Sequence, residues 1–142
     1  FTGGGLIRKE LLSIPTLGVI NCHMGPLPRY RGMDVVEYPV LENRLDQEGV
    51  GLTLHYMDQG VDTGPLLIRK RIEPLNGESF ARLRHRMERQ MAELVVEGIA
   101  GLISGKVIPQ PQRVEDGRQY FVMHPRVHAL AVEKLRLLRN AG

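Results

Sequence analysis

The chain has 142 residues, a formal net charge of +3 and a single cysteine, and 42% of its residues are hydrophobic and 25% charged. This balance suits one soluble domain with a real core, and it excludes collagen, coiled coil, wholesale disorder and an internal disulfide framework. The small basic excess does not indicate a nucleic-acid partner, and no apolar run approaches the roughly 20 residues that span a bilayer, so we expect a cytoplasmic protein without a membrane partner.

Short elements separated by loops are predicted for the first third of the chain. We expect a short helix over 6–13, a buried strand over 17–22 and an irregular loop over 24–32, which is rich in proline and glycine. Asp34 and Glu37 have the spacing of a capping box, which predicts a helix that begins at Asp34 and runs to about residue 44.

Two strands follow, joined by a loop. The segment 51–58 alternates, with Leu52 and Leu54 on one face and Thr53 and His55 on the other. The segment 66–72 is predicted to be its partner, and the intervening residues favour turns.

The longest helix is predicted over 79–104, with Ser79 as its N-cap and Gly105 as its stop. A loop over 109–117, an extended piece over 119–123 and a helix over 125–139 complete the chain. We therefore expect a main unit over 1–105 and a C-terminal extension over 106–142.

The residues most suited to chemistry lie at the end of the first predicted strand. Asn21 and His23 are two residues apart, so both side chains project from one face. An amide N–H stabilises negative charge on a carbonyl oxygen, and an imidazole moves a proton. A carboxylate beside the imidazole would orient it and favour its charged form, and Asp58 and Asp62 are the candidates.

Ordinary structural roles compete with each of these assignments. His23 can be a satisfied strand-end histidine, and the stretch from Asp62 to Pro65 can be a plain turn. His55 is expected to pack or to hydrogen-bond across strands. Cys22 points away from its two neighbours and is expected in the core.

Other polar residues are assigned to the surface. Arg29 and Arg31 can meet an anion, but solvated loop charges are the default expectation. The histidines at 85, 124 and 128 lack ligand spacing, so no metal site is predicted.

Two stretches carry a resemblance to a known family. Residues 21–32, NCHMGPLPRYRG, resemble the N-x-H-x-S-L-L-P-x-Y-R-G signature of the formyltetrahydrofolate-dependent formyltransferases. Residues 49–58, GVGLTLHYMD, followed by GVDTGP at 60–65, resemble the second signature of that family. Gly25 and Pro26 depart from the first signature by replacing its serine and first leucine, which is expected to change loop contacts to the acceptor.

The resemblance implies an α/β, Rossmann-like formyltransferase fold. It covers residues 3–75 and enters the family's pattern part-way, so we expect the N-terminal βαβ portion to be absent. A sheet without that portion has an open edge, which favours a homo-oligomer.

The resemblance also implies site residues and a reaction. The family's catalytic residues fall on Asn21, His23 and Asp62. An acceptor amine attacks the formyl group of 10-formyltetrahydrofolate, Asn21 and protonated His23 stabilise the oxyanion, and Asp62 supports His23 and the proton relay. The folate-binding positions fall on two loops, at Gly4, Gly5 and Leu6, and at Gln59, Gly60, Val61, Thr63 and Gly64.

Three readings of function therefore stay open. The first is transfer of a formyl group to a small amine acceptor, with an amino sugar nucleotide as a candidate. The second is a formyltetrahydrofolate hydrolase, in which water replaces the amine. The third is a non-catalytic fragment, or a folate-binding or oligomerising module.

Overall fold

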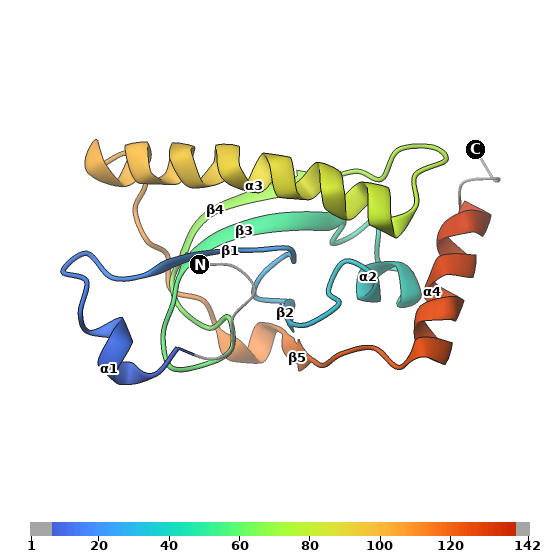
Figure 1. The fold of residues 1–142 in the computed structure, drawn as a ribbon, viewed down its shortest axis with the longest axis horizontal. Coiled ribbons are helices and arrows are strands. Elements are labelled where there is room, and N and C mark those ends of the chain that lie inside the picture. The colour runs from blue at the N-terminus through green and yellow to red at the C-terminus, as the bar shows by residue number, and fades with distance from the viewer. Residues whose placement is uncertain (1–6, 139–142) are drawn as a thin grey trace.

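A three-stranded antiparallel sheet, covered on one face by a long helix, forms the centre of the protein (Figure 1). The computed structural model describes residues 7–138. The elements, in chain order, are α1 (Lys9–Leu12), β1 (Ile20–His23), β2 (Tyr30–Gly32), α2 (Tyr38–Leu41), β3 (Val50–Tyr56), β4 (Leu66–Ile72), α3 (Phe80–Ile103), a 3-10 turn (Val114–Asp116), β5 (Arg118–Tyr120) and α4 (Pro125–Leu138).

The central strand of the sheet is β3, and it is buried on both faces. The order is β1-β3-β4, so β3 pairs with its neighbours on both sides. Leu54 faces α3, and Thr53 and His55 lie on the opposite face of the strand. Thr53 contacts the segment that follows β1, His55 contacts Asn21 of β1, and all three residues are at most 1% exposed. Among the described residues β1 pairs with β3 alone, so its outer edge carries no strand.

The helix α3 is the element that the sequence predicts best. The Ser79 hydroxyl accepts a hydrogen bond from the N–H of Arg82, as an N-cap does. Gly105 has φ +70°, and the N–H of Lys106 donates to the carbonyl of Gly101, which closes the helix. At Gly98 an added Cβ would lie 2.0 Å from a methyl of Leu54, so glycine lets the helix approach β3 closely. The buried stripe of α3 comprises Phe80, Leu83, Met87, Leu94, Gly98 and Gly101.

A second, smaller layer forms where β2 pairs in parallel with β5. The rings of Tyr30 and Tyr120 stack with centroids 5.1 Å apart, and both hydroxyls donate to the carboxylate of Glu42. The prediction that 24–32 is wholly irregular is therefore wrong at its end. The strand β2 forms by pairing with β5, which lies far along the chain. The local sequence carries no sign of such a pairing.

The capping box predicted at Asp34 and Glu37 is wrong. Asp34 has φ +52° and its carboxylate accepts the N–H of Met123, while α2 begins only at Tyr38. The carboxylate of Glu37 is buried and receives two hydrogen bonds from Arg84 of α3. Tertiary partners thus take both carboxylates that local spacing assigned to a cap.

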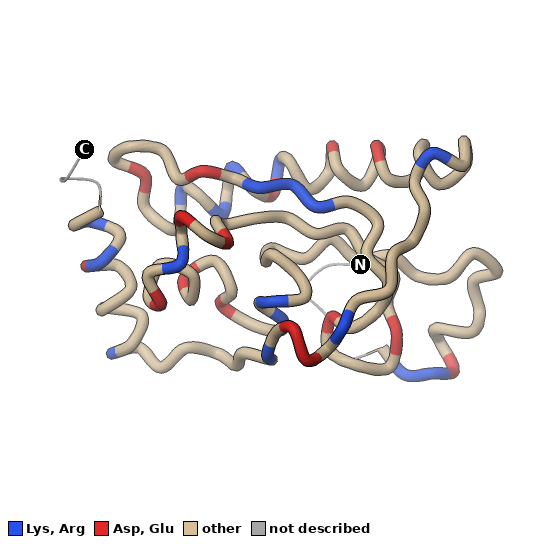
Figure 2. Tube along the Cα trace, turned by 180° about the vertical axis from the view of Figure 1, so that it is seen from behind, with Lys and Arg blue, Asp and Glu red and all other residues tan. Residues whose placement is uncertain are grey.

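The remaining bounds differ from expectation at element ends. Leu17 is 83% exposed and β1 starts at Ile20, so the buried strand is shorter at its start than predicted. The short helix α1 spans only Lys9–Leu12. No helix within residues 7–138 is long and apolar enough to cross a membrane. Basic and acidic residues are interspersed along the trace (Figure 2).

The residues after Gly105 pack onto the main unit. Gln110 pairs through its backbone with Leu66 at the start of β4, β5 pairs with β2, and α4 packs against α2. The division of the chain at residue 105 stays a prediction. If residues 1–105 fold as a separate unit, they must do so without these contacts.

Candidate active site

The paired ends of β1 and β3 place four polar side chains on one face of the sheet. Asn21 lies opposite His55, and His23 lies opposite Thr53, so the two pairs share a face. Cys22 lies on the opposite face, within the core cluster, as predicted. Burial raises the pKa of the Cys22 thiol to about 11, which keeps it protonated and unreactive at neutral pH.

Asp62 reaches this face from the loop after β3. Its Oδ2 lies 3.5 Å from Nδ1 of His23, and its Oδ1 lies 3.5 Å from Nε2 of His55. The N–H of Gly32 donates to Oδ2 at 2.8 Å and fixes the carboxylate from the β2 side. Asp58, the other candidate carboxylate, instead accepts hydrogen bonds from the N–H of Gly60 and the hydroxyl of Thr63 within its own loop.

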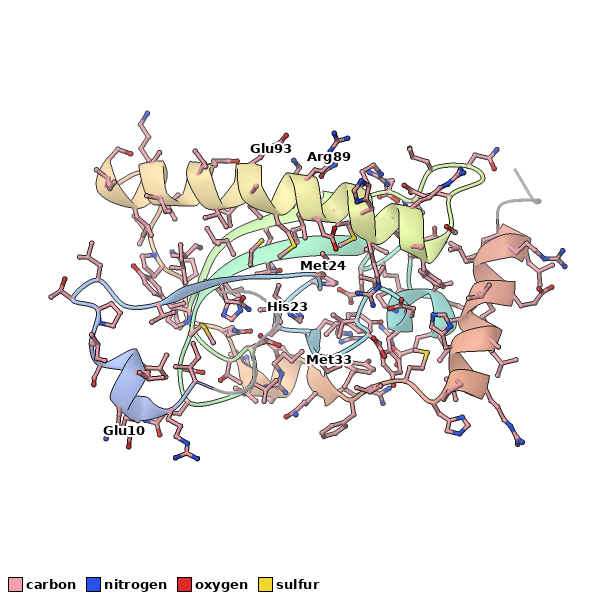
Figure 3. The ribbon with its side chains drawn as sticks, viewed as in Figure 1. Glu10, His23, Met24, Met33, Arg89 and Glu93 are labelled. Carbon is pink, nitrogen blue, oxygen red and sulfur yellow. The ribbon has the colours of Figure 1, made fainter. Side chains whose placement is uncertain are left out.

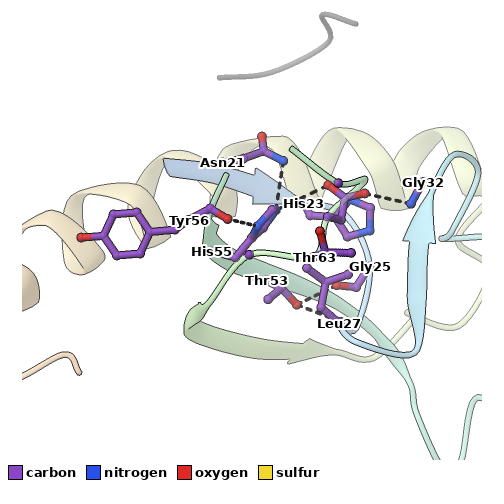
Figure 4. A network of polar contacts seen from close by, with 12 residues as sticks. Asn21, His23, Gly25, Leu27, Gly32, Thr53, His55, Tyr56 and Thr63 are labelled. Atoms are coloured by element: carbon purple, nitrogen blue, oxygen red, sulfur yellow. Dashed lines mark hydrogen bonds and ion pairs between the residues drawn. The ribbon is translucent and has the colours of Figure 1, made fainter. Parts of the chain in front are cut away.

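Backbone carbonyls fix the tautomers of the two histidines, because a carbonyl oxygen only accepts. Nε2 of His23 donates to the carbonyl of Tyr30 at 2.8 Å, which leaves Nδ1 facing Asp62. Nδ1 of His55 donates to the carbonyl of Tyr56 at 2.7 Å, so Nε2 of the neutral ring accepts the amide N–H of Asn21 at 3.3 Å (Figure 4).

The charge state of His23 differs from the sequence-based expectation. The imidazole is buried between the sheet and the β2 layer, whereas Arg89 and Glu93 extend from the outer side of α3 (Figure 3). Burial lowers the pKa of His23 below its ordinary value of 6.5, although the Asp62 charge and the Tyr30 carbonyl oppose that effect. The expectation that a carboxylate keeps His23 charged at neutral pH is therefore wrong, and Nδ1 is free to accept a proton.

Asp62 keeps its negative charge in this setting. Burial alone raises the pKa of Asp62, but the contacts with His55 and His23 and the hydrogen bond from the N–H of Gly32 together bring that pKa below its ordinary value. An ionised carboxylate beside a neutral imidazole is arranged to stabilise that imidazole once it takes up a proton. The pair can therefore hold one transferred proton on His23.

Gly25 explains one departure from the family signature. An added Cβ at this position would lie 2.6 Å from Nε2 of His23 and 2.8 Å from the carbonyl of Tyr30. The hydroxyl of Thr53 donates to the carbonyl of Gly25 and accepts the N–H of Leu27, which ties this turn to β3. A serine at position 25 would therefore require a shift of the His23 imidazole, of the Tyr30 carbonyl or of the position 25 backbone itself.

The folate-binding positions predicted on the second loop surround Asp62. Gln59 and Gly60 are exposed, Val61 and Thr63 are half-buried, and Gly64 is buried. An added Cβ at Gly64 would lie 2.0 Å from the carbonyl of Tyr56, so the loop lies directly on the end of β3. Gly4, Gly5 and Leu6 lie outside the described residues.

Sequence reasoning placed His55 correctly across the strands but missed its contact with Asp62. It also missed Gln112, whose amide Nε2 donates to the carbonyls of Asp62 and Gly64. The alternation of 51–58 shows that His55 shares a face with Thr53, but not which loop covers that face. Within residues 7–138 no group of three or more His, Cys, Asp or Glu side chains could hold a metal ion.

Two cavities lie beside the cluster of Asn21, His23 and Asp62 and do not include these residues. One, of about 540 Å³, is lined by residues of β5 and the neighbouring turns, including Arg29, Arg44 and Arg118. The other, of about 470 Å³, includes Thr53 in its lining. Neither lining includes Asn21, His23 or Asp62.

Known proteins match this arrangement of sequence and fold. Residues 4–99 match the model of the formyl transferase family. A methionyl-tRNA formyltransferase of Pelobacter propionicus is 38% identical over 109 residues, which is 77% of this chain and 33% of that protein. The same enzyme of Halorhodospira halophila is 35% identical over 117 residues, which is 82% of this chain and 36% of that protein.

Solved structures share the fold. The formyltransferase PseJ of Anoxybacillus kamchatkensis, in complex with UDP-4,6-dideoxy-4-formamido-L-AltNAc and tetrahydrofolate, aligns with a TM-score of 0.71 at 23% identity, covering 84% of this chain and 60% of that one. The phosphoribosylglycinamide formyltransferase of Bacillus halodurans aligns with a TM-score of 0.58 at 23% identity, covering 70% of this chain and 50% of that one. The chain spans about a third of the length of the curated relatives that it matches.

Proposed function

Because the chain belongs to the formyl transferase family, we propose that it transfers a formyl group from 10-formyltetrahydrofolate to the amine of a small acceptor. The observation that carries the proposal is the approach of Asp62 to His23 within a cluster completed by Asn21. Two separate segments converge there, β1 and the loop after β3, and together they supply the groups that acyl transfer requires. Structural neighbours crystallised with tetrahydrofolate or a formyl derivative of it support the choice of donor.

Asn21 is suited to stabilise the oxyanion. One hydrogen of its amide Nδ2 is used by His55, which fixes the plane of the side chain. The second hydrogen remains for the formyl oxygen, on which negative charge develops when the amine attacks. His55 thereby acts as the support that orients Asn21.

His23 and Asp62 are suited to manage the proton. The donor supplies the formyl group: its carbon forms a bond to the acceptor nitrogen, and its bond to the folate nitrogen breaks. Nδ1 of neutral His23 takes the proton that the amine loses, and Asp62 stabilises the resulting imidazolium. The same proton then returns to the folate nitrogen, so the site ends each turnover in its starting state.

The finer assignment of the acceptor is an amino sugar nucleotide. It is supported by structural neighbours whose complexes contain a formamido sugar nucleotide or a dTDP amino sugar. The curated relatives act on methionyl-tRNA, so that substrate is the direct competitor in a test. An amino sugar nucleotide is a small molecule, whereas methionyl-tRNA is a macromolecule, so one assay with both acceptors distinguishes them.

The test is an acceptor-dependence assay with 10-formyltetrahydrofolate as donor. Tetrahydrofolate release is followed in the presence of the amine precursor of the formamido sugar nucleotide, of initiator methionyl-tRNA, or of no acceptor, with mass spectrometry of the products. We expect release that requires the sugar nucleotide. Release without any acceptor would indicate a hydrolase, formylation of methionyl-tRNA would replace the assigned acceptor, and absence of both turnover and donor binding would indicate a non-catalytic module.

A further inference from the structure

We propose that Gln112 is a positioning residue that holds the Asp62 loop, and through it the Asp62 carboxylate, against His23 and His55. The proposal rests on the proposed function only where it concerns turnover. The geometric part stands on the contacts of the Gln112 amide and can be tested without a substrate.

The amide of Gln112 bridges two carbonyls of the loop. Its Nε2 donates to the carbonyl of Asp62 at 2.8 Å and to the carbonyl of Gly64 at 2.6 Å. Both partners are acceptors, so the orientation of the amide is fixed. Its Oε1 is buried without a hydrogen-bond partner. A buried acceptor without a partner costs free energy. The two hydrogen bonds that the Gln112 amide donates must offset this cost, which indicates that they are the purpose of the side chain.

The loop needs such a support. Asp62 has φ +53°, a left-handed backbone conformation that costs about 1 kcal/mol or more outside glycine and persists where its surroundings impose it. Gln112 fixes the backbone carbonyl of Asp62 on one side, and the N–H of Gly32 fixes its carboxylate on the other. The carboxylate is thus aimed by two constraints that meet at one residue.

Both constraints depend on the segment after α3. Gln110 exchanges two backbone hydrogen bonds with Leu66, at 2.7 and 2.8 Å, which anchors the segment just before Gln112. Further along, β5 pairs with β2, and the N–H of Met33 donates to the carbonyl of Tyr120, which holds the strand that carries Gly32. The segment from 110 to 120 therefore acts as a strap across the site, with Gln112 as its point of contact with the Asp62 loop.

Loss of the Gln112 donors has a consequence that a purely structural role lacks. The groups that face His23 are the carboxylate of Asp62, the imidazole of His55 and the carbonyl of Tyr30. Of these, Asp62 opposes most strongly the lowering of the His23 pKa by burial. If the loop moves away, the Asp62 charge is withdrawn and the imidazole loses part of its cover, so the pKa of His23 departs from its wild-type value.

The experiment compares Gln112→Met with the matched control Gln110→Met in the full chain. The Gln110 side chain is exposed, and within residues 7–138 its amide donates only to the carbonyl of Ile108, so its removal leaves the backbone anchor in place. The first readout is an NMR titration of the His23 imidazole, assigned with His23→Gln. The second is kcat and KM for formyl transfer.

We expect Gln112→Met to change the pKa of His23 and to reduce kcat by about 100-fold, the scale of a displaced catalytic group, with a smaller change in KM. Gln110→Met is expected to match the wild-type protein in both readouts. A wild-type His23 titration in Gln112→Met would overturn the proposal. If Gln112→Met does not fold, Gln112→Glu, which keeps the length and replaces both donors by an acceptor, is held to the same criteria.

The two proposals fail separately. If the wild-type protein transfers no formyl group but Gln112→Met still shifts the His23 titration, the proposed function fails and the placement of Asp62 by Gln112 stands. If formyl transfer is observed and the titration does not move, the placement fails and the function stands.

Discussion

Asp62 Oδ2 lies 3.5 Å from Nδ1 of His23, although β2 and β3 separate the two residues along the chain. The carboxylate is ionised, and burial keeps the imidazole neutral in the free protein. A neutral base beside a fixed negative charge is prepared to become a cation, so this contact sets how the site responds to pH and to substitution.

The first prediction concerns the pH dependence of turnover in Asp62→Asn. In the proposed mechanism His23 acts as a neutral base, so we expect activity to be lost as pH falls through the pKa of His23, which lies below 6.5. The Asp62 charge favours the imidazolium, and its removal lowers that pKa further. We expect the acid limb of the kcat profile to move to lower pH, with a plateau reduced by about 100-fold or more. An acid limb that moves to higher pH would contradict this assignment.

The second prediction concerns stability and follows from the same pKa. In the unfolded chain His23 titrates near 6.5, while the folded pKa is lower, so the unfolded state binds more protons between the two values. The free energy of unfolding should therefore fall as pH decreases from neutral through 6.5 towards the folded pKa. Urea denaturation at several pH values measures this free energy. We expect it to depend less on pH in His23→Gln than in the wild-type protein, and an identical dependence in the two proteins would refute the lowered pKa.

The third prediction concerns Asn21→Ala. This substitution removes the amide that we propose as the donor to the formyl oxygen, and it leaves His55 without its hydrogen bond from Nδ2. Loss of one oxyanion donor lowers kcat by about 100- to 1,000-fold. Asn21 is only half-buried, so the midpoint of thermal unfolding should change little. Single-turnover kinetics with saturating donor provide the measurement, and an unchanged rate would remove Asn21 from the mechanism.

The fourth prediction concerns the ion pair between Arg84 and Glu37, which joins α3 to the segment before α2. Glu37 is 2% exposed and receives hydrogen bonds at 3.0 and 2.6 Å from Arg84. Arg84→Ala leaves this carboxylate buried without its main partner, which should cost about 3 kcal/mol of unfolding free energy. The control Arg136→Ala breaks an exposed pair with Glu133 and should cost at most about 0.5 kcal/mol. Equal costs in the two variants would show that the buried pair is not special.

Much of the fold was predictable because its signals are local. The periodic apolar stripe, Ser79 and Gly105 define α3 within the sequence itself, and alternation defines β3. The elements that sequence reasoning missed or misplaced depend on distant partners. β2 exists through its pairing with β5, and Asp34 is used by the N–H of Met123 rather than by a helix N-terminus.

The candidate site divides in the same way. Two sequence motifs contain the site residues: one carries Asn21 and His23, and the other carries Asp62. The structure brings these three side chains into one cluster. His55 and Gln112 join them through cross-strand register and through a segment beyond α3, neither of which a motif encodes. The charge state of His23 was misjudged because burial, which outweighs the Asp62 charge, is a property of the folded chain.

The most direct test of the central claim is the single-turnover rate of formyl transfer from 10-formyltetrahydrofolate in His23→Ala, compared with the wild-type protein and with Cys22→Ala. Cys22 is adjacent in sequence but lies in the core on the opposite face of the sheet, so it controls for disturbance of β1. The account predicts a rate lower by about two to four orders of magnitude in His23→Ala and near wild type in Cys22→Ala. A wild-type rate in a folded His23→Ala protein would contradict the role of the His23–Asp62 pair in formyl transfer.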